Sequence, residues 1–194
     1  MHKLSNSPDL LEVFIKGMNE VFLAEQLSVL VPSNLPETHS GKTINPIENL
    51  LIAAERQFGI ISASGLFFRC GGAAFKHLVR KYGKAAEIDS LEFRLQPQQK
   101  RLRNGVVKLI QLLETWQAGK FSIKRSDDLV EITASASGLN VSNAGGQIWL
   151  HFIAGLFQEY LYWAGSGKQY PFQIIAQDQP GKEIIIQFRN VPVD

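Results

Sequence analysis

The stretch from Gly146 to Trp163 constrains the fold more than any other part of the chain. It reads GQIWLHFIAGLFQEYLYW, with apolar side chains at most helical positions. Its polar residues and one glycine recur at spacings of three and four, which predicts a single narrow stripe on a helix: Gln147, His151, Gly155, Gln158, Glu159 and Tyr162. A helix that is apolar on most sides must be covered on most sides. We therefore expect a central helix over 147–165, with the rest of the chain packed around it.

Composition excludes several classes of protein. The chain has 194 residues, 45% hydrophobic and 20% charged, which suits one soluble domain with or without an extension. A net charge of +2 is too balanced to indicate nucleic-acid binding or an anionic membrane. A single cysteine, Cys70, excludes an intrachain disulfide and a cysteine-rich zinc site. The start, MHKLSNSPDLLEVF, is not typical of a signal peptide, and the polar stripe makes 147–165 a poor membrane span. We expect a cytoplasmic protein.

Helical periodicity and stop signals predict four further helices. Ser7-Pro8-Asp9 is a good helix start, and the apolar spacing continues to about residue 30. The remaining helices are expected at 46–58, 61–82 and 97–118, with a break at Gly59 and a stop at Tyr82-Gly83. Residues 31–45 are predicted to form a loop, and 85–97 are ambiguous and can hold a short helix.

Two β-hairpins flank the central helix. The first covers 121–133 with a turn at 126–128, and the second joins 172–177 to 183–188 through a turn at 179–181. The order of helices, hairpin, helix and hairpin predicts an α+β fold, in which an antiparallel sheet of two hairpins packs against a helical layer. We divide the chain into an N-terminal helix and loop extension over 1–45 and an α+β domain over 46–194.

The predicted helix over 61–82 is rich in small residues. It reads ISASGLFFRCGGAAFKHLVRKY and holds three glycines, each costing roughly 1 kcal/mol of helix propensity relative to alanine. This pattern indicates close approach of another helix, or of a ligand, along that face. Aromatic residues on the central helix would then form the opposite wall of a pocket for a flat or elongated ligand.

Three segments in order resemble the 4-vinyl reductase domain, a family also called hydrocarbon-binding proteins. They are FGIISASGLFFRCGGAAFKHLVRKYG, the hairpin around Asp127, and WLHFIAGLFQEYLYWAGSGKQYPFQIIAQDQPGKEIIIQF. With MNEVFLAEQL, which resembles an extension of some members, the likeness spans residues 18 to 193. It implies the architecture of the haem–NO-binding domain and of a TRAPP-complex subunit, which enclose an apolar ligand or acyl chain between helices and sheet.

The chain departs from this family at its cysteines. Many members carry cysteines before the central helix and in the last hairpin, whereas this chain has Leu150 at one such position and none in the last hairpin. We therefore expect no thiolate metal site, because His151 alone cannot bind a structural zinc. The family's arginine has a match in Arg69, but the usual glycine–arginine pair is replaced by Gly71-Gly72.

The predicted ligand-binding residues are those that would face this pocket. They are Phe67, Phe68, Arg69, Cys70, Phe75, Trp116, Trp149, His151, Phe152 and Tyr160. Each has a plainer interpretation: the aromatics as core, Cys70 as a buried thiol, His151 as a hydrogen-bonded interior histidine, and Arg69 as a surface ion pair. The sharper interpretations are an acylated or ligand-facing Cys70, an axial haem ligand or polar anchor at His151, and a carboxylate contact at Arg69.

Three functions remain open on this basis. The first is a non-catalytic binding domain, regulatory or carrier, for a small hydrophobic molecule such as a fatty acid, an isoprenoid, an aromatic or a tetrapyrrole. The second, implied by the family name, is a reductase or accessory protein in chlorophyll biosynthesis; the sequence has no phosphate loop, serine-hydrolase elbow or dinucleotide fingerprint, and we assign no catalytic residue. The third is an assembly module. We also expect a homodimer, formed through the helix at 8–30.

Overall fold

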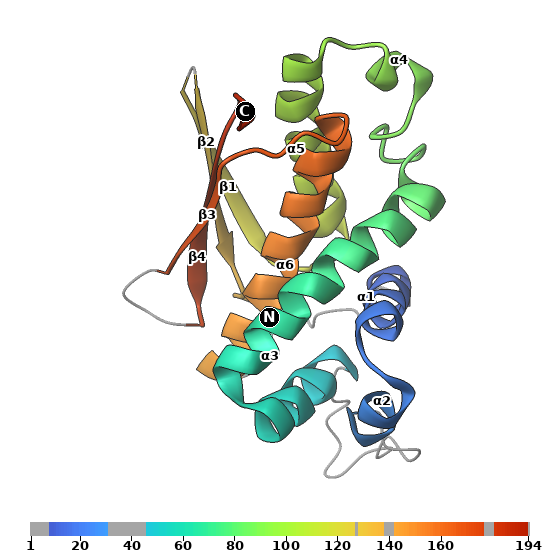
Figure 1. Ribbon diagram of the computed structural model, residues 1–194, viewed down its shortest axis with the longest axis vertical. Helices are drawn as coiled ribbons and strands as arrows, with labels where there is room; N and C mark the ends of the chain where they lie inside the picture. The colour runs from blue at the N-terminus through green and yellow to red at the C-terminus, as the bar shows by residue number, and fades with distance from the viewer. Residues whose placement is uncertain (1–7, 31–45, 127, 138–141, 177–180, 194) are drawn as a thin grey trace.

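Helix α6 lies between a four-stranded sheet and a long helix, α3, that crosses it diagonally (Figure 1). The computed structural model describes residues 8–30, 46–126, 128–137, 142–176 and 181–193. The elements in chain order are α1 (Pro8–Val21), α2 (Ala24–Leu30), α3 (Pro46–Tyr82), α4 (Leu91–Arg94), α5 (Gln98–Thr115), β1 (Lys120–Arg125), β2 (Leu129–Ser135), α6 (Asn143–Ala164), β3 (Phe172–Ala176) and β4 (Glu183–Arg189).

The sheet is antiparallel throughout, with strand order β1-β2-β4-β3. Alternate residues of β2 and β4 are buried beneath the helices: Val130, Ile132, Ala134, Ile184, Ile186 and Phe188. Ile186 pairs with Ile132 on one side and Ile174 on the other, so this row runs across three strands. The sheet therefore presents one apolar face to the helical layer, which confirms the predicted α+β fold. The predicted turns at 126–128 and 179–181 lie partly outside the described residues.

The small residues of α3 bring its backbone into direct contact with that of α6. A Cβ added at Gly155 would lie 1.9 Å from the carbonyl oxygen of Phe68, and one added at Gly71 would lie 2.0 Å from that of Phe152. Only glycine allows two backbones to approach this closely. Of the two explanations for these glycines, close helix packing is the one that the structure shows at this crossing.

Gly59 bends α3 without ending it. Its φ of 72° and ψ of 163° lie outside the helical region, so the two helices expected over 46–58 and 61–82 join as one kinked helix. Among the described helices, α3 alone is long and apolar enough to cross a membrane, judged by length and composition. In its apolar 18-residue stretch, 39% is buried inside the structure. Core helices pass the same test, and α3 packs along α1 and α6.

The single helix expected over 8–30 is wrong. Helix α1 ends at Val21 and α2 starts at Ala24. Between them, Gln26 Oε1 accepts a hydrogen bond from the Leu23 backbone N–H at 3.0 Å. Such a side-chain acceptor competes with continued helix. The division into an extension and a domain at residue 45 stays a prediction.

The apolar face of α1 is buried within the chain, against α3. Leu10, Val13, Phe14 and Met18 are all buried, and a Cβ at Gly17 would lie 2.4 Å from the carbonyl oxygen of Cys70. This face is therefore not available for the expected dimerisation, and the homodimer stays a prediction without an interface.

Polar contacts along the outer edge fix α1 on α3. Tyr82 donates a hydrogen bond to Asp9 at 2.7 Å, Lys81 pairs with Glu12 at 2.5 Å, and His77 contacts Glu20 at 2.5 Å. The His77 side chain is 21% exposed beside this carboxylate. These contacts lie at the rim, so they orient α1 more than they stabilise it.

We expect the stabilising effect of Glu12 to vanish in acid. Hydrogen bonds from Lys16 and then Lys81 lower the pKa of Glu12 from 4.5 to about 2. A carboxyl whose pKa is depressed on folding stabilises the fold above its unfolded pKa and loses that effect as pH falls through the folded value. Wild type should therefore melt above Glu12→Gln at neutral pH, and the difference should close between about pH 4.5 and 2.

Thermal melting followed by circular dichroism across that pH range measures this difference. Glu25→Gln is the matched control, since Glu25 lies on α2 and its carboxylate has no described hydrogen bond or ion pair. A Glu12→Gln difference that stays constant from neutral pH to the acid end would show that the Glu12 contacts do not form in solution.

Candidate ligand-binding site

Four aromatic rings from three helices meet in the interior. Phe14 of α1 lies 5.7 Å from Phe67 of α3, and 5.7 Å and 4.9 Å from Trp149 and Phe152 of α6, measured between ring centroids. Trp149 and Phe152 stack at 5.2 Å. All four side chains have 0% exposure. We call this cluster the aromatic centre; Phe14 is the ring that the other three share.

The single polar atom of the aromatic centre, Nε1 of Trp149, already has a hydrogen-bond partner. Trp149 donates its Nε1–H to the carbonyl oxygen of Ala118 at 2.7 Å, which fixes the ring against the link between α5 and β1. The bond satisfies the one polar atom among the four rings. The surface that these rings present to one another is therefore apolar.

The other predicted residues lie in separate places. Phe75 contacts Tyr160 edge-on at 6.0 Å, and Tyr160 donates its hydroxyl to the backbone carbonyl of Arg101 at 2.5 Å. Burial raises the pKa of Tyr160 far above its usual range. Trp116 packs on Tyr82 at 4.9 Å.

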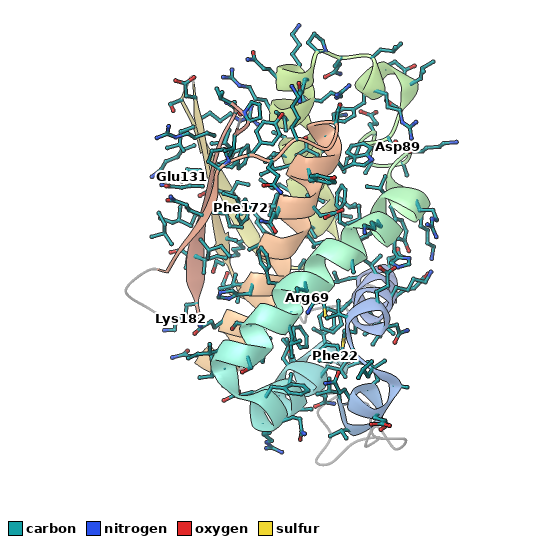
Figure 2. The ribbon with its side chains drawn as sticks, viewed as in Figure 1. Phe22, Arg69, Asp89, Glu131, Phe172 and Lys182 are labelled. Atoms are coloured by element: carbon teal, nitrogen blue, oxygen red, sulfur yellow. The ribbon has the colours of Figure 1, made fainter. Side chains whose placement is uncertain are left out.

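Two further predicted residues of α3 lie away from the aromatic centre. Phe68 meets Phe172 of β3 at 6.2 Å, whereas Arg69 is exposed (Figure 2). The structure thus brings together three of the ten predicted residues, namely Phe67, Trp149 and Phe152. It adds Phe14, whose helical spacing predicted burial but not its partners.

Cys70 is a buried, protonated thiol. It has 0% exposure, and burial raises its pKa to about 12, although the charge of Arg69 opposes this shift. At neutral pH it is therefore neither a nucleophile nor a thiolate ligand.

We expect Cys70 in the folded protein to resist thiol reagents. Labelling with 5,5′-dithiobis(2-nitrobenzoate) at neutral pH should be slow in buffer and fast in urea, because the reagent needs an accessible thiolate. Full labelling of the native protein within the mixing time would contradict the burial of this side chain. No second cysteine interferes, since the chain has only one.

His151 on α6 has one ring nitrogen in contact with the backbone and one without a described contact. Its Nδ1 contacts the carbonyl oxygen of Gln147, one turn earlier on α6, at 2.8 Å. Donation by Nδ1–H leaves the Nε2 lone pair as an acceptor. His77 contacts Glu20 instead, while His2 and His39 lie outside the described residues.

A haem between α3 and α6 does not fit these residues. His151 supplies a nitrogen of the right kind, but one turn further the helices touch backbone to backbone at Gly155, which leaves no slot for a flat macrocycle at this crossing. Cys70 is not a thiolate, and the Tyr160 hydroxyl donates its hydrogen bond to backbone carbonyl oxygens. In the described part of the chain, no three His, Cys, Asp or Glu side chains gather in a metal-binding arrangement.

Solved structures with a similar fold are H-NOX domains. "Fe(II) unliganded H-NOX protein from K. algicida" aligns with a TM-score of 0.61 and 12% identity, covering 94% of this chain and 97% of that one. "An oxygen binding H-NOX domain related to soluble guanylate cyclases" aligns with a TM-score of 0.58 and 9% identity, covering 95% of each chain. A structure described as "Probing the function of heme distortion in the H-NOX family" aligns with a TM-score of 0.57 and 11% identity, covering 95% of each.

The chain therefore has an α+β fold of the H-NOX, or haem–NO-binding, type. At such low identity the likeness extends to the fold alone. No family model matches the sequence, and neither does any curated protein. The relation in fold to the haem–NO-binding domain is confirmed, whereas the resemblance to the 4-vinyl reductase domain stays a prediction.

Proposed function

We propose that this chain is a non-catalytic binding domain for a small hydrophobic molecule, with a regulatory or carrier role. The observation that carries the proposal is the aromatic centre, in which Phe14 of α1 closes a set of rings from α3 and α6. The H-NOX fold supports it, since one structural neighbour is an oxygen-binding domain. The ligand is an apolar aromatic or a short acyl chain, because the rings offer no polar group.

Movement of α1 would admit the ligand. The helix joins α3 through one apolar face and a rim of exposed or half-buried polar contacts, so it could separate without opening the α3–α6 crossing. A ligand in the place of Phe14 would meet Phe67, Trp149 and Phe152, and α1 would be displaced. That displacement would be the signal that a partner reads, because ligand binding shifts the protein toward the conformation that holds it.

An assembly module is the second candidate. It is favoured by the fact that the chain fills its own aromatic centre with Phe14, so the fold needs no ligand to complete its packing. No observation favours reductase chemistry. His151 and Tyr160, whose side chains could donate a proton, both contact backbone carbonyl oxygens.

Native mass spectrometry of the purified protein, followed by denaturing extraction, is the first test. A mass excess that is lost on denaturation, with an extractable apolar molecule, supports the binding proposal. The second test adds naphthalene or decanoic acid to the protein and follows amide hydrogen exchange.

The binding proposal expects faster exchange in α1, with α5 unchanged as the internal control. An apo mass, together with exchange that neither probe alters, would favour the assembly module instead.

A further inference from the structure

A surface groove lies on the opposite side of α6 from the sheet, among α3, α4 and α6. It has a volume of about 290 Å³ and is lined by Phe75, Lys76, Val79, Arg80, Asp89, Arg94, Glu159 and Trp163. Figure 2 labels Asp89 beside α4, at the end of the molecule away from α2. The volume lies near the lower end of the usual range for ligand sites, roughly 300–1,000 Å³, so the groove suits a small molecule.

The apolar floor of the groove is held in place from both sides. Trp163 stacks on Phe93 of α4 with ring centroids 6.2 Å apart and an interplanar angle of 9°. It also meets Phe75 of α3 at 6.0 Å and 64°. Because Phe75 and Phe93 are each 1% exposed, they fix the ring from below. A ligand would therefore meet a preformed aromatic surface.

One wall of the groove is rigid and electrically balanced. Asp89 pairs with Arg94 at 2.7 Å, and the backbone N–H groups of Ile88 and Asp89 both donate to the carbonyl oxygen of Gly83. These bonds fix the segment that leads from α3 to α4. Asp89 and Arg94 thus neutralise each other, so a charged ligand would pair with side chains of α3 and α6 instead.

Three other charged side chains in the groove have no ion-pair partner among the described residues. Lys76 and Arg80 on α3 and Glu159 on α6 make no hydrogen bond or ion pair with any described residue. Lys76 and Arg80 are exposed, whereas Glu159 is half-buried and lies near Gly72, where an added Cβ would be 3.9 Å from its carboxylate oxygen. A half-buried carboxylate without a partner is unfavourable, and a cation beside it would offset this cost.

We infer that this groove binds a small zwitterion with an apolar body, such as an α-amino acid with an apolar side chain. Its ammonium group would pair with Glu159, and its carboxylate with Arg80 and Lys76. The side chain would lie on Trp163 and Val79, with Phe75 supporting Trp163 from below. Opposite charges on the two helices select a molecule that carries both, and arginine suits a carboxylate in particular. The site shares no residue with the aromatic centre, so the inference is independent of the proposed function.

Isothermal titration of the full chain with L-phenylalanine and L-leucine tests the inference. The comparison ligands for phenylalanine are 2-phenylethylamine, which lacks the carboxylate, and 3-phenylpropanoate, which lacks the ammonium group. We expect each analogue to bind at least about 10-fold more weakly than phenylalanine, because each loses one charge-assisted hydrogen bond.

Variants then assign each charge to its helix. Arg80→Gln should weaken the binding of phenylalanine about 10-fold and leave the binding of 2-phenylethylamine unchanged. Glu159→Gln should weaken the binding of phenylalanine and leave the binding of 3-phenylpropanoate unchanged. Arg56→Gln on α3 and Glu114→Gln on α5 are matched controls outside the groove, and they should bind as wild type.

The inference is overturned if neither amino acid binds saturably at millimolar concentration, or if the two analogues bind as tightly as phenylalanine. It is also overturned if Arg80→Gln weakens all three ligands equally. Any of these results would leave the proposal for the aromatic centre untouched.

Discussion

Gly155→Ala is expected to destabilise the protein by about 3 kcal/mol, at the upper end of what overpacking one small group costs. The added methyl would lie 1.9 Å from the carbonyl oxygen of Phe68. Neither side of this contact is a flexible side chain, so α3 and α6 would have to separate, and their shared core would open. Urea unfolding followed by circular dichroism measures the change. Gly71→Ala should behave alike, since its methyl would meet the carbonyl oxygen of Phe152 at 2.0 Å.

Gly65→Ala is the matched control on the same helix. A Cβ at Gly65 has nothing within 4 Å, so alanine should be tolerated and should add up to roughly 1 kcal/mol through helix propensity. Opposite signs for Gly65→Ala and Gly155→Ala would establish the backbone contact. Equal losses at the two positions would mean that the glycines matter only for local flexibility.

Phe14→Ala is expected to cost about 3–5 kcal/mol, the usual range for truncating a buried phenylalanine. Its ring has 0% exposure and contacts Phe67, Trp149 and Phe152. The loss should appear as a lower urea midpoint, with Asn19→Ala, an exposed position on the same helix, within about 0.5 kcal/mol of wild type.

The cavity left by Phe14→Ala should also bind a ligand. An apolar cavity of this kind stays dry and takes up benzene, so saturating benzene should raise the melting temperature of Phe14→Ala more than that of wild type. If the variant loses less than about 1 kcal/mol, α1 does not close the aromatic centre, and the proposed route for a ligand would fail with it.

The central helix and both hairpins were predictable because their patterns are local. Expected at 147–165, α6 runs from Asn143 to Ala164, with Ser142 as its N-cap. The last hairpin pairs Phe172–Ala176 with Glu183–Arg189, close to the expected strands. An apolar run bounded by glycines, or an alternation of period two, depends on few distant contacts. The order β1-β2-β4-β3 depends on such contacts and did not follow from the pattern.

The N-terminal region shows where pattern alone fails. The spacing of Leu10, Phe14 and Met18 predicted a helix with one apolar face, and that face exists. The pattern could not show that the face packs on α3 rather than on a second copy, because both partners would bury the same side chains. Nor could it reveal the break after Phe22, which depends on the amide of Gln26.

The site was predictable only as a set of buried residues. Phe67, Trp149 and Phe152 each contact Phe14, whereas Trp116 and Tyr160 are buried among other neighbours. The role of these residues in ligand binding stays a prediction. Glycines that favour a ligand and glycines that favour a helix look alike in sequence, and only the distances at Gly71 and Gly155 separate them. The groove beside Trp163 was missed because residues 85–97, which form its outer wall, have no clear periodicity.

The pairing of α3 with α6 also has a consequence for biosynthesis. These helices are far apart in the chain: Ser142, the N-cap of α6, hydrogen-bonds to Glu55 of α3 across 87 residues. While the ribosome is still making the residues between them, α3 is complete but lacks its main partner, and it is the one described helix apolar enough to pass for a membrane span. Contacts this distant in sequence form slowly. We therefore expect the nascent chain to expose an apolar surface until α6 has emerged, and a chain terminated between α3 and α6 to keep that surface uncovered and prone to aggregate.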